Sequence, residues 1–100
     1  MATPRLSSPL NLEDRTLWFG TVELYEDTVV ISGWTWWGRV RETIPLESIA
    51  VFEKWSTLKG QNFCFVCNGR APVWGRIERG AELWALELKK EEGIELKRRH

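Results

Sequence analysis

The hydrophobic period of the chain changes once, and this change limits the folds that the sequence can adopt. Up to residue 77 the apolar residues come in short runs that suit β-strands, separated by turn signals such as Asn68-Gly69. From Ala81 to Glu92 nearly every residue is a good helix former, and apolar residues recur at helical spacing. Because 100 residues form one domain at most, we expect a small, mainly β domain closed by one C-terminal amphipathic helix.

Several segments have the composition and alternation of strands, and short turns join some of them into hairpins. The expected strands are Thr16–Tyr25, Thr28–Trp34, Arg39–Pro45, Ile49–Trp55, Asn62–Cys67 and Val73–Ile77. In the first strand, alternation predicts Trp18, Val22 and Leu24 on one face. In the third, it predicts Arg39 and Arg41 together on the face opposite the apolar residues.

The two ends of the chain differ from its middle. Residues 1–13 carry prolines and serines without periodicity, so we expect a loose tail or a lead-in strand there. Residues 14–93 hold the expected domain, with the helix at about 79–92 and its stripe formed by Ala81, Trp84, Ala85 and Leu88. Residues 94–100 are expected to be a solvated basic tail.

This order of strands and helix resembles the bacterial pleckstrin-homology-like (PH-like or GRAM-like) domains. Three stretches between residue 16 and about residue 92 carry the resemblance: Gly20-x-Val22-x-Leu24, Ile44-Pro45-Leu46-Glu47-Ser48-Ile49, and Trp84 in the helix. PH-like folds often place a Trp in this helix, where it plugs one end of the barrel. The resemblance implies an antiparallel barrel of about six to seven strands capped by the helix. It also implies a non-catalytic module that binds lipid, peptide or protein.

One departure from that family concerns phosphoinositides. Family members that bind them place several basic residues in the first hairpin loop, whereas this chain has Glu26-Asp27, which would repel a phosphorylated headgroup. Arg39 and Arg41 without such a loop form a weak anion site. Lys97–His100 adds about 1 kcal/mol per basic residue near an anionic surface, which is a weak anchor.

The charge balance and the cysteine count narrow the function classes further. With 14 basic and 14 acidic residues the formal net charge is zero, so we expect no nucleic-acid partner. The sequence has no apolar run near the length of a membrane span, and residues 1–12 lack the apolar core of a signal peptide. With two cysteines and no export signal, the expected location is the cytoplasm.

We expect no enzyme, no cofactor and no metal site. The only histidine is His100, so the chain holds no internal base to activate a Ser or Cys nucleophile. Cys64 and Cys67 are spaced as C-x-x-C, but on a strand their Cα atoms lie about 10 Å apart, too far for a disulfide. Zinc would need two further ligands. We expect both cysteines to be ordinary strand residues.

Tryptophan is the unusual residue, with seven in 100 positions. A core of this size cannot enclose seven indoles and satisfy every N–H group. One interpretation of Trp34-Thr35-Trp36-Trp37-Gly38-Arg39 is a hairpin whose aromatic residues pair across strands and cover the barrel rim. A second is an exposed binding patch. A third, stacking of single-stranded bases, is disfavoured by the neutral charge.

The candidate binding residues are therefore Trp34, Trp36, Trp37, Arg39 and Arg41. Trp and Arg are the residue types enriched at binding hot spots. The expected partner is another protein or a second copy of this chain, as in a homodimer. The alternative is a peripheral membrane surface, bound through exposed Trp and the basic tail.

Overall fold

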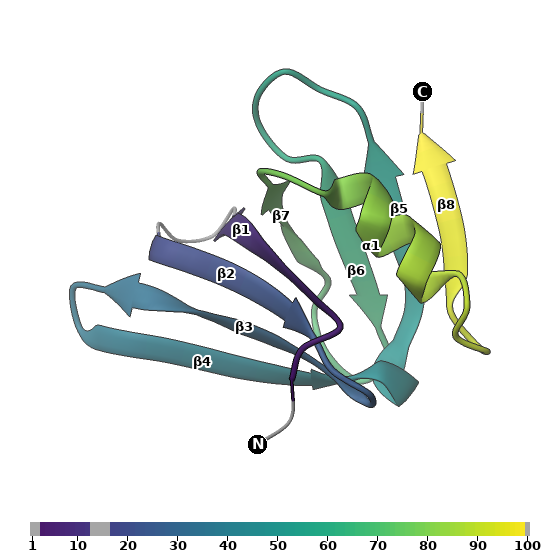
Figure 1. Ribbon diagram of the computed structural model, residues 1–100, viewed down its shortest axis with the longest axis horizontal. Coiled ribbons are helices and arrows are strands. Elements are labelled where there is room, and N and C mark those ends of the chain that lie inside the picture. Colours follow the sequence, from purple (N-terminus) through teal and green to yellow (C-terminus); the bar gives the residue numbers. More distant parts are fainter. Residues whose placement is uncertain (1–2, 13–16, 100) are drawn as a thin grey trace.

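The computed structural model describes residues 3–12 and 17–99, and their arrangement is shown in Figure 1. The elements are β1 (Leu6–Leu12), β2 (Trp18–Leu24), β3 (Thr28–Thr35), β4 (Gly38–Pro45), η1 (Leu46–Ser48), β5 (Ile49–Trp55), β6 (Phe63–Cys67), β7 (Val73–Ile77), α1 (Ala81–Leu88) and β8 (Glu95–Arg99). The expected class, mainly β with one helix, is confirmed. The expected strand start at Thr16 and the terminal His100 lie outside the described residues.

The strands form one sheet that bends back over itself at β1. Their order is β4-β3-β2-β1-β7-β6-β5-β8. Residues Leu6–Pro9 of β1 pair with β2, whereas Leu10–Leu12 pair with β7. The single strand β1 therefore belongs to both halves of the sheet, and the core lies between the halves (Figure 1).

The sheet differs from the expected barrel in two respects. It has eight strands in the described residues instead of six to seven, and it runs from an edge at β4 to an edge at β8 without closing. Of the two alternatives for residues 1–13, the lead-in strand is found, as β1.

The expected basic tail at residues 94–100 is instead strand β8, which pairs in parallel with β5. Ile94 and Leu96 pack against the core, so this segment has an apolar face as well as a basic one. The helix ends at Leu88 instead of residue 92 because the chain must turn towards β5. The amides of Lys90 and Glu91 donate to carbonyls only three residues back, and Gly93 adopts a φ of 88°.

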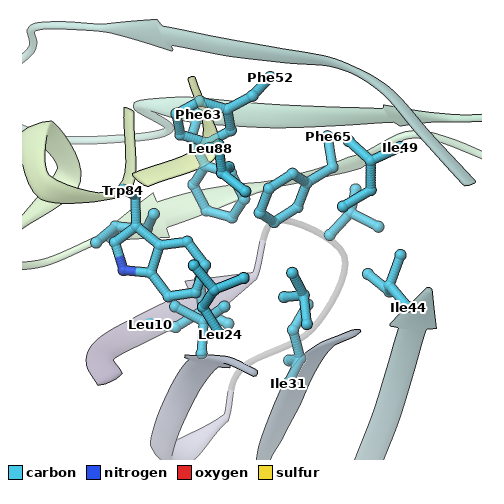
Figure 2. Close-up of a cluster of buried hydrophobic side chains, with 14 of the residues drawn as sticks. Leu10, Leu24, Ile31, Ile44, Ile49, Phe52, Phe63, Phe65, Trp84 and Leu88 are labelled. Atoms are coloured by element: carbon cyan, nitrogen blue, oxygen red, sulfur yellow. The ribbon is translucent and has the colours of Figure 1, made fainter. Parts of the chain in front are cut away.

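The core is built around aromatic rings and branched aliphatic side chains from both halves of the sheet. Figure 2 shows Trp84 of α1 close to Leu10 and Leu24, with the rings of Phe63 and Phe65 above them. The centroids of these two phenyl rings lie 5.2 Å apart. Trp84, Ala85 and Leu88 are fully buried and Ala81 packs against them, so the expected helix stripe is confirmed.

The indole N–H of Trp84 has a partner inside the core. It donates to Oγ of Ser8 on β1 at 3.0 Å, and both side chains are buried. A buried N–H without a partner costs about 1–3 kcal/mol, so this contact is a condition for placing a Trp here. It joins α1 directly to the strand that both halves of the sheet share.

Trp84→Ala should lower the free energy of unfolding by about 3–5 kcal/mol, because it empties a large buried site. Ser8→Ala should cost about 1–3 kcal/mol by leaving the indole N–H without its acceptor. Leu83→Ala is the matched control, since Leu83 lies on the same helix and is 55% exposed; it should change stability by less than about 0.5 kcal/mol. Urea denaturation measures all three, and equal stability of Trp84→Ala and wild type would show that α1 is not part of the core.

Glu82 ties the outer face of α1 to strands β5 and β8. Its carboxylate accepts two hydrogen bonds from Arg98, at 2.7 and 2.8 Å, and lies 3.1 Å from Nζ of Lys54. The hydrogen bonds from Arg98, followed by that from Lys54, lower the pKa of Glu82 from 4.5 to about 2. The carboxylate therefore stays ionised in the folded protein at pH values where the unfolded chain protonates it.

The depressed pKa of Glu82 predicts a pH-dependent contribution to stability. It is fully present above pH 4.5 and is lost as the pH falls towards about 2, because protonation removes the charge that Arg98 and Lys54 bind. Glu82→Gln should be less stable than wild type at pH 6, and the two should converge near pH 2. Urea denaturation across this pH range tests it; a difference that does not change with pH would contradict the assignment.

Candidate functional site

The β3–β4 hairpin carries two tryptophans at its turn. The backbone N–H of Trp37 donates to Oγ1 of Thr35 at 3.2 Å, and that hydroxyl donates to the carbonyl of Gly38, also at 3.2 Å. Gly38 adopts a φ of 121°, which suits glycine. The turn is therefore held by its own hydrogen bonds, and it leaves the side chains of Trp36 and Trp37 outside the sheet.

Trp18 and Phe19 join these residues on the surface. The expectation that Trp18 lies on the face of Val22 and Leu24 is wrong, because β2 contains a bulge. Between the pairs Trp18–Trp34 and Thr21–Ser32, two residues of β2 lie opposite one residue of β3. The extra residue reverses the alternation and turns Trp18 outwards. Phe19 within the bulge has a φ of 54°.

We call the resulting cluster the aromatic tip. Its members and their exposed fractions are Trp18 (48%), Phe19 (89%), Trp34 (50%), Trp36 (86%) and Trp37 (97%). The rings of Trp18 and Trp36 meet edge to face with centroids 5.5 Å apart, and Trp18 lies opposite Trp34 across the strands. Both sequence interpretations thus hold in part: aromatic residues pair at the rim, and Phe19, Trp36 and Trp37 remain exposed.

The aromatic tip rests on a closely packed base. Leu17 is buried beneath it, and its Cβ lies 3.0 Å from the position that a Cβ on Gly33 would take. A Cβ on Gly20 would lie 2.3 Å from the carbonyl oxygen of Leu10. Only glycine fits at either position, so β2 and β3 approach Leu17 and β1 closely. The tip therefore stands on a fixed part of the sheet.

Arg39 and Arg41 lie beside the tip on the outer face of β4, as the alternation predicted. Arg39 is opposite Trp34 and Arg41 is opposite Ser32 in the strand register. Both are exposed. Among the residues that the structure describes, neither arginine forms an ion pair. The tip thus combines exposed indoles with two available cations.

All five predicted site residues therefore lie together at one end of the β3–β4 hairpin. Sequence reasoning missed Trp18 and Phe19, since strict alternation placed Trp18 inside. Of the seven tryptophans, only Trp84 is fully buried, as the limited core volume required. Trp55 and Trp74 are half-buried and contact each other on a different part of the sheet, with ring centroids 5.9 Å apart.

The chemistry available at the described residues is that of contact and not of ligation. They include no group of three or more His, Cys, Asp or Glu side chains that could hold a metal ion. Within residues 3–12 and 17–99, no helix is long and apolar enough to cross a membrane. Comparisons of the chain with protein-family models, curated proteins and solved structures found no match.

The two cysteines are reduced, and both are buried in β6. Cys67 points into the core and its thiol lies 3.9 Å from the carbonyl oxygen of Phe65. Burial raises the pKa of the Cys67 thiol, so less of the reactive thiolate is present at neutral pH.

Both cysteines should react slowly with a thiol reagent in the folded protein and rapidly in denaturant, because burial restricts access and thiolate formation. A colorimetric thiol assay at pH 7–8, with and without urea, measures the two rates. A disulfide between Cys64 and Cys67 detected by mass spectrometry, or fast reaction of the folded protein, would contradict this prediction.

Proposed function

We propose that this chain is a small, non-catalytic binding module of the PH-like type, and that it contacts a protein partner through the aromatic tip together with Arg39 and Arg41. The observation that carries the proposal is the gathering of five exposed aromatic residues at one place on the surface. Scattered single apolar residues are normal on a protein surface, whereas a contiguous patch of this kind marks a contact site.

The PH-like part of the proposal is supported by the order of elements. An antiparallel meander, β1 to β4, is followed by β5 to β7 and a helix whose Trp84 enters the core. The parallel strand β8 and the open sheet depart from that pattern. These departures leave the tip unaffected, because it lies on β2, β3 and β4.

A protein partner suits the chemistry of the tip. A fully buried aromatic side chain removes about 150–250 Å² from water, at about 25 cal/mol per Å² of apolar area. Exposed indoles therefore gain free energy when a partner covers them, and a Trp loses little conformational entropy on binding. Arg39 and Arg41 can add hydrogen bonds to carboxylates at the rim of such a contact.

The alternative, a peripheral membrane surface, loses one of its two supports. It relied on exposed Trp and a free basic tail, but the tail is strand β8 and Arg98 is engaged by Glu82. Exposed Trp alone remains in its favour, because indoles partition to the membrane interface.

Trp36→Ala/Trp37→Ala should abolish binding while leaving the fold intact. Both side chains are almost fully exposed, so the change in stability should be below about 0.5 kcal/mol. Affinity for a protein partner or for a second copy should fall by at least about tenfold, as expected for hot-spot residues. Sedimentation over a concentration series measures self-association, and affinity capture with either protein as bait measures binding to other proteins.

The matched control is Leu83→Ala/Leu86→Ala, which removes two exposed apolar side chains from α1, away from the tip. This variant should bind as wild type does. Co-sedimentation with phosphatidylcholine–phosphatidylserine vesicles at low salt and at about 0.15 M salt tests the alternative. Loss of vesicle binding in the tryptophan variant, with no change in self-association or capture, would favour a membrane and count against a protein partner.

A further inference from the structure

The far end of the β3–β4 hairpin carries a groove of about 520 Å³. It is lined by the β2–β3 turn, by the end of β4 with η1, and by the segment that follows α1: Glu26, Asp27, Thr28, Pro45, Leu46, Glu47, Glu91, Glu92 and Ile94. Because β4 has eight residues, the groove lies roughly 24 Å along the hairpin from the aromatic tip. Its volume is within the range of pockets that enclose a small organic group.

The groove has an apolar lining and an acidic rim. Pro45, Leu46 and Ile94 supply the apolar part. On the rim, Glu91 accepts a hydrogen bond from Arg5 at 2.8 Å. The other rim acids, Glu26, Asp27, Glu47 and Glu92, form no ion pair with any described residue. The zero net charge of the chain thus hides a separation: available acids at one end of the hairpin and available arginines at the other.

We propose that the partner of the aromatic tip is the groove of a second copy, so that the chain associates head to tail. Trp36 and Trp37 of one copy would enter the groove of the next, against Pro45, Leu46 and Ile94. Arg39 and Arg41 would lie at its acidic rim, where their charges find carboxylates. This inference rests on the proposed function and names the partner of that same surface.

A symmetric contact between two tips is less favourable than a head-to-tail contact. In a two-fold dimer the same patch meets itself. Antiparallel pairing of two β4 edges puts Arg39 opposite Arg41 when Val40 lies on the axis. With Arg41 on the axis, that arginine lies opposite its own copy. Like charges directly opposite destabilise a strand pair, and charged side chains on an edge strand discourage edge-to-edge pairing.

A head-to-tail contact leaves one free tip and one free groove on every dimer. Association therefore continues beyond the dimer, into a ring if the rotation closes and into an open filament if it does not. The contact depends on opposite charges, so it should weaken as salt is raised. A symmetric tip-to-tip contact would instead stop at the dimer.

Two variants separate these modes. The tip variant is Trp36→Ala/Trp37→Ala, and the groove variant is Glu47→Lys/Glu92→Lys, whose two side chains are exposed. Wild type should form species larger than dimers as its concentration rises, and each variant alone should remain a monomer. An equimolar mixture should form a one-to-one dimer and nothing larger, because only the tip of the groove variant and the groove of the tip variant are intact. Sedimentation velocity measures all four samples.

A charge exchange serves as the control for specificity. Arg39→Glu/Arg41→Glu should weaken association at least about tenfold. Adding Glu47→Lys/Glu92→Lys to the same chain should restore it, since each contact again joins opposite charges. Circular dichroism of every variant establishes that the fold is retained.

Three results would overturn the head-to-tail contact. They are a wild-type chain that stays monomeric at all concentrations, a groove variant that associates as wild type does, and a mixture of the two variants that remains monomeric. The second result, with association still lost in the tip variant, would leave the proposed function standing with a different partner surface. Equal behaviour of the tip variant and wild type in both sedimentation and affinity capture would instead count against the proposed function itself.

Discussion

The hydrogen bond between Trp84 and Ser8 holds the structure at the point where its parts meet. Ser8 lies on β1, the one strand that pairs with both halves of the sheet, and Trp84 lies on the only helix of the described residues. The indole fills the space between the halves, and the hydroxyl satisfies its N–H there. Because both halves depend on β1, the position of this ring fixes how the hairpins lie relative to the helix.

This central ring also explains why the other tryptophans lie further out. Phe52, Phe63 and Phe65 occupy much of the remaining core volume, and they contact one another. The bulge at Phe19 then moves Trp18 from the inner to the outer face, where it meets Trp36. A limited core and one irregularity in β2 together produce the aromatic tip.

Local patterns in the sequence predicted most of the fold. Strand β5 was expected at its observed bounds, and Asn68-Gly69 and Glu26-Asp27 marked turns that the structure contains. Tertiary effects account for the errors. The bulge depends on how Leu17 packs over Gly20 and Gly33, which are distant enough in sequence that alternation cannot reveal it. Strand β8 reads as a basic tail because its partner, β5, lies some forty residues earlier.

The residues that stabilise the fold and those that form the candidate site are different sets. The buried core cluster contains no member of the aromatic tip, whereas the base beneath the tip, with Leu17, belongs to it. Side chains at the tip can therefore change with little effect on folding, while their positions remain fixed by the sheet. A rigid support limits the entropy lost when a partner binds. Because β4 links the tip to the acidic groove as one continuous strand, the same support also fixes the direction in which the two surfaces face.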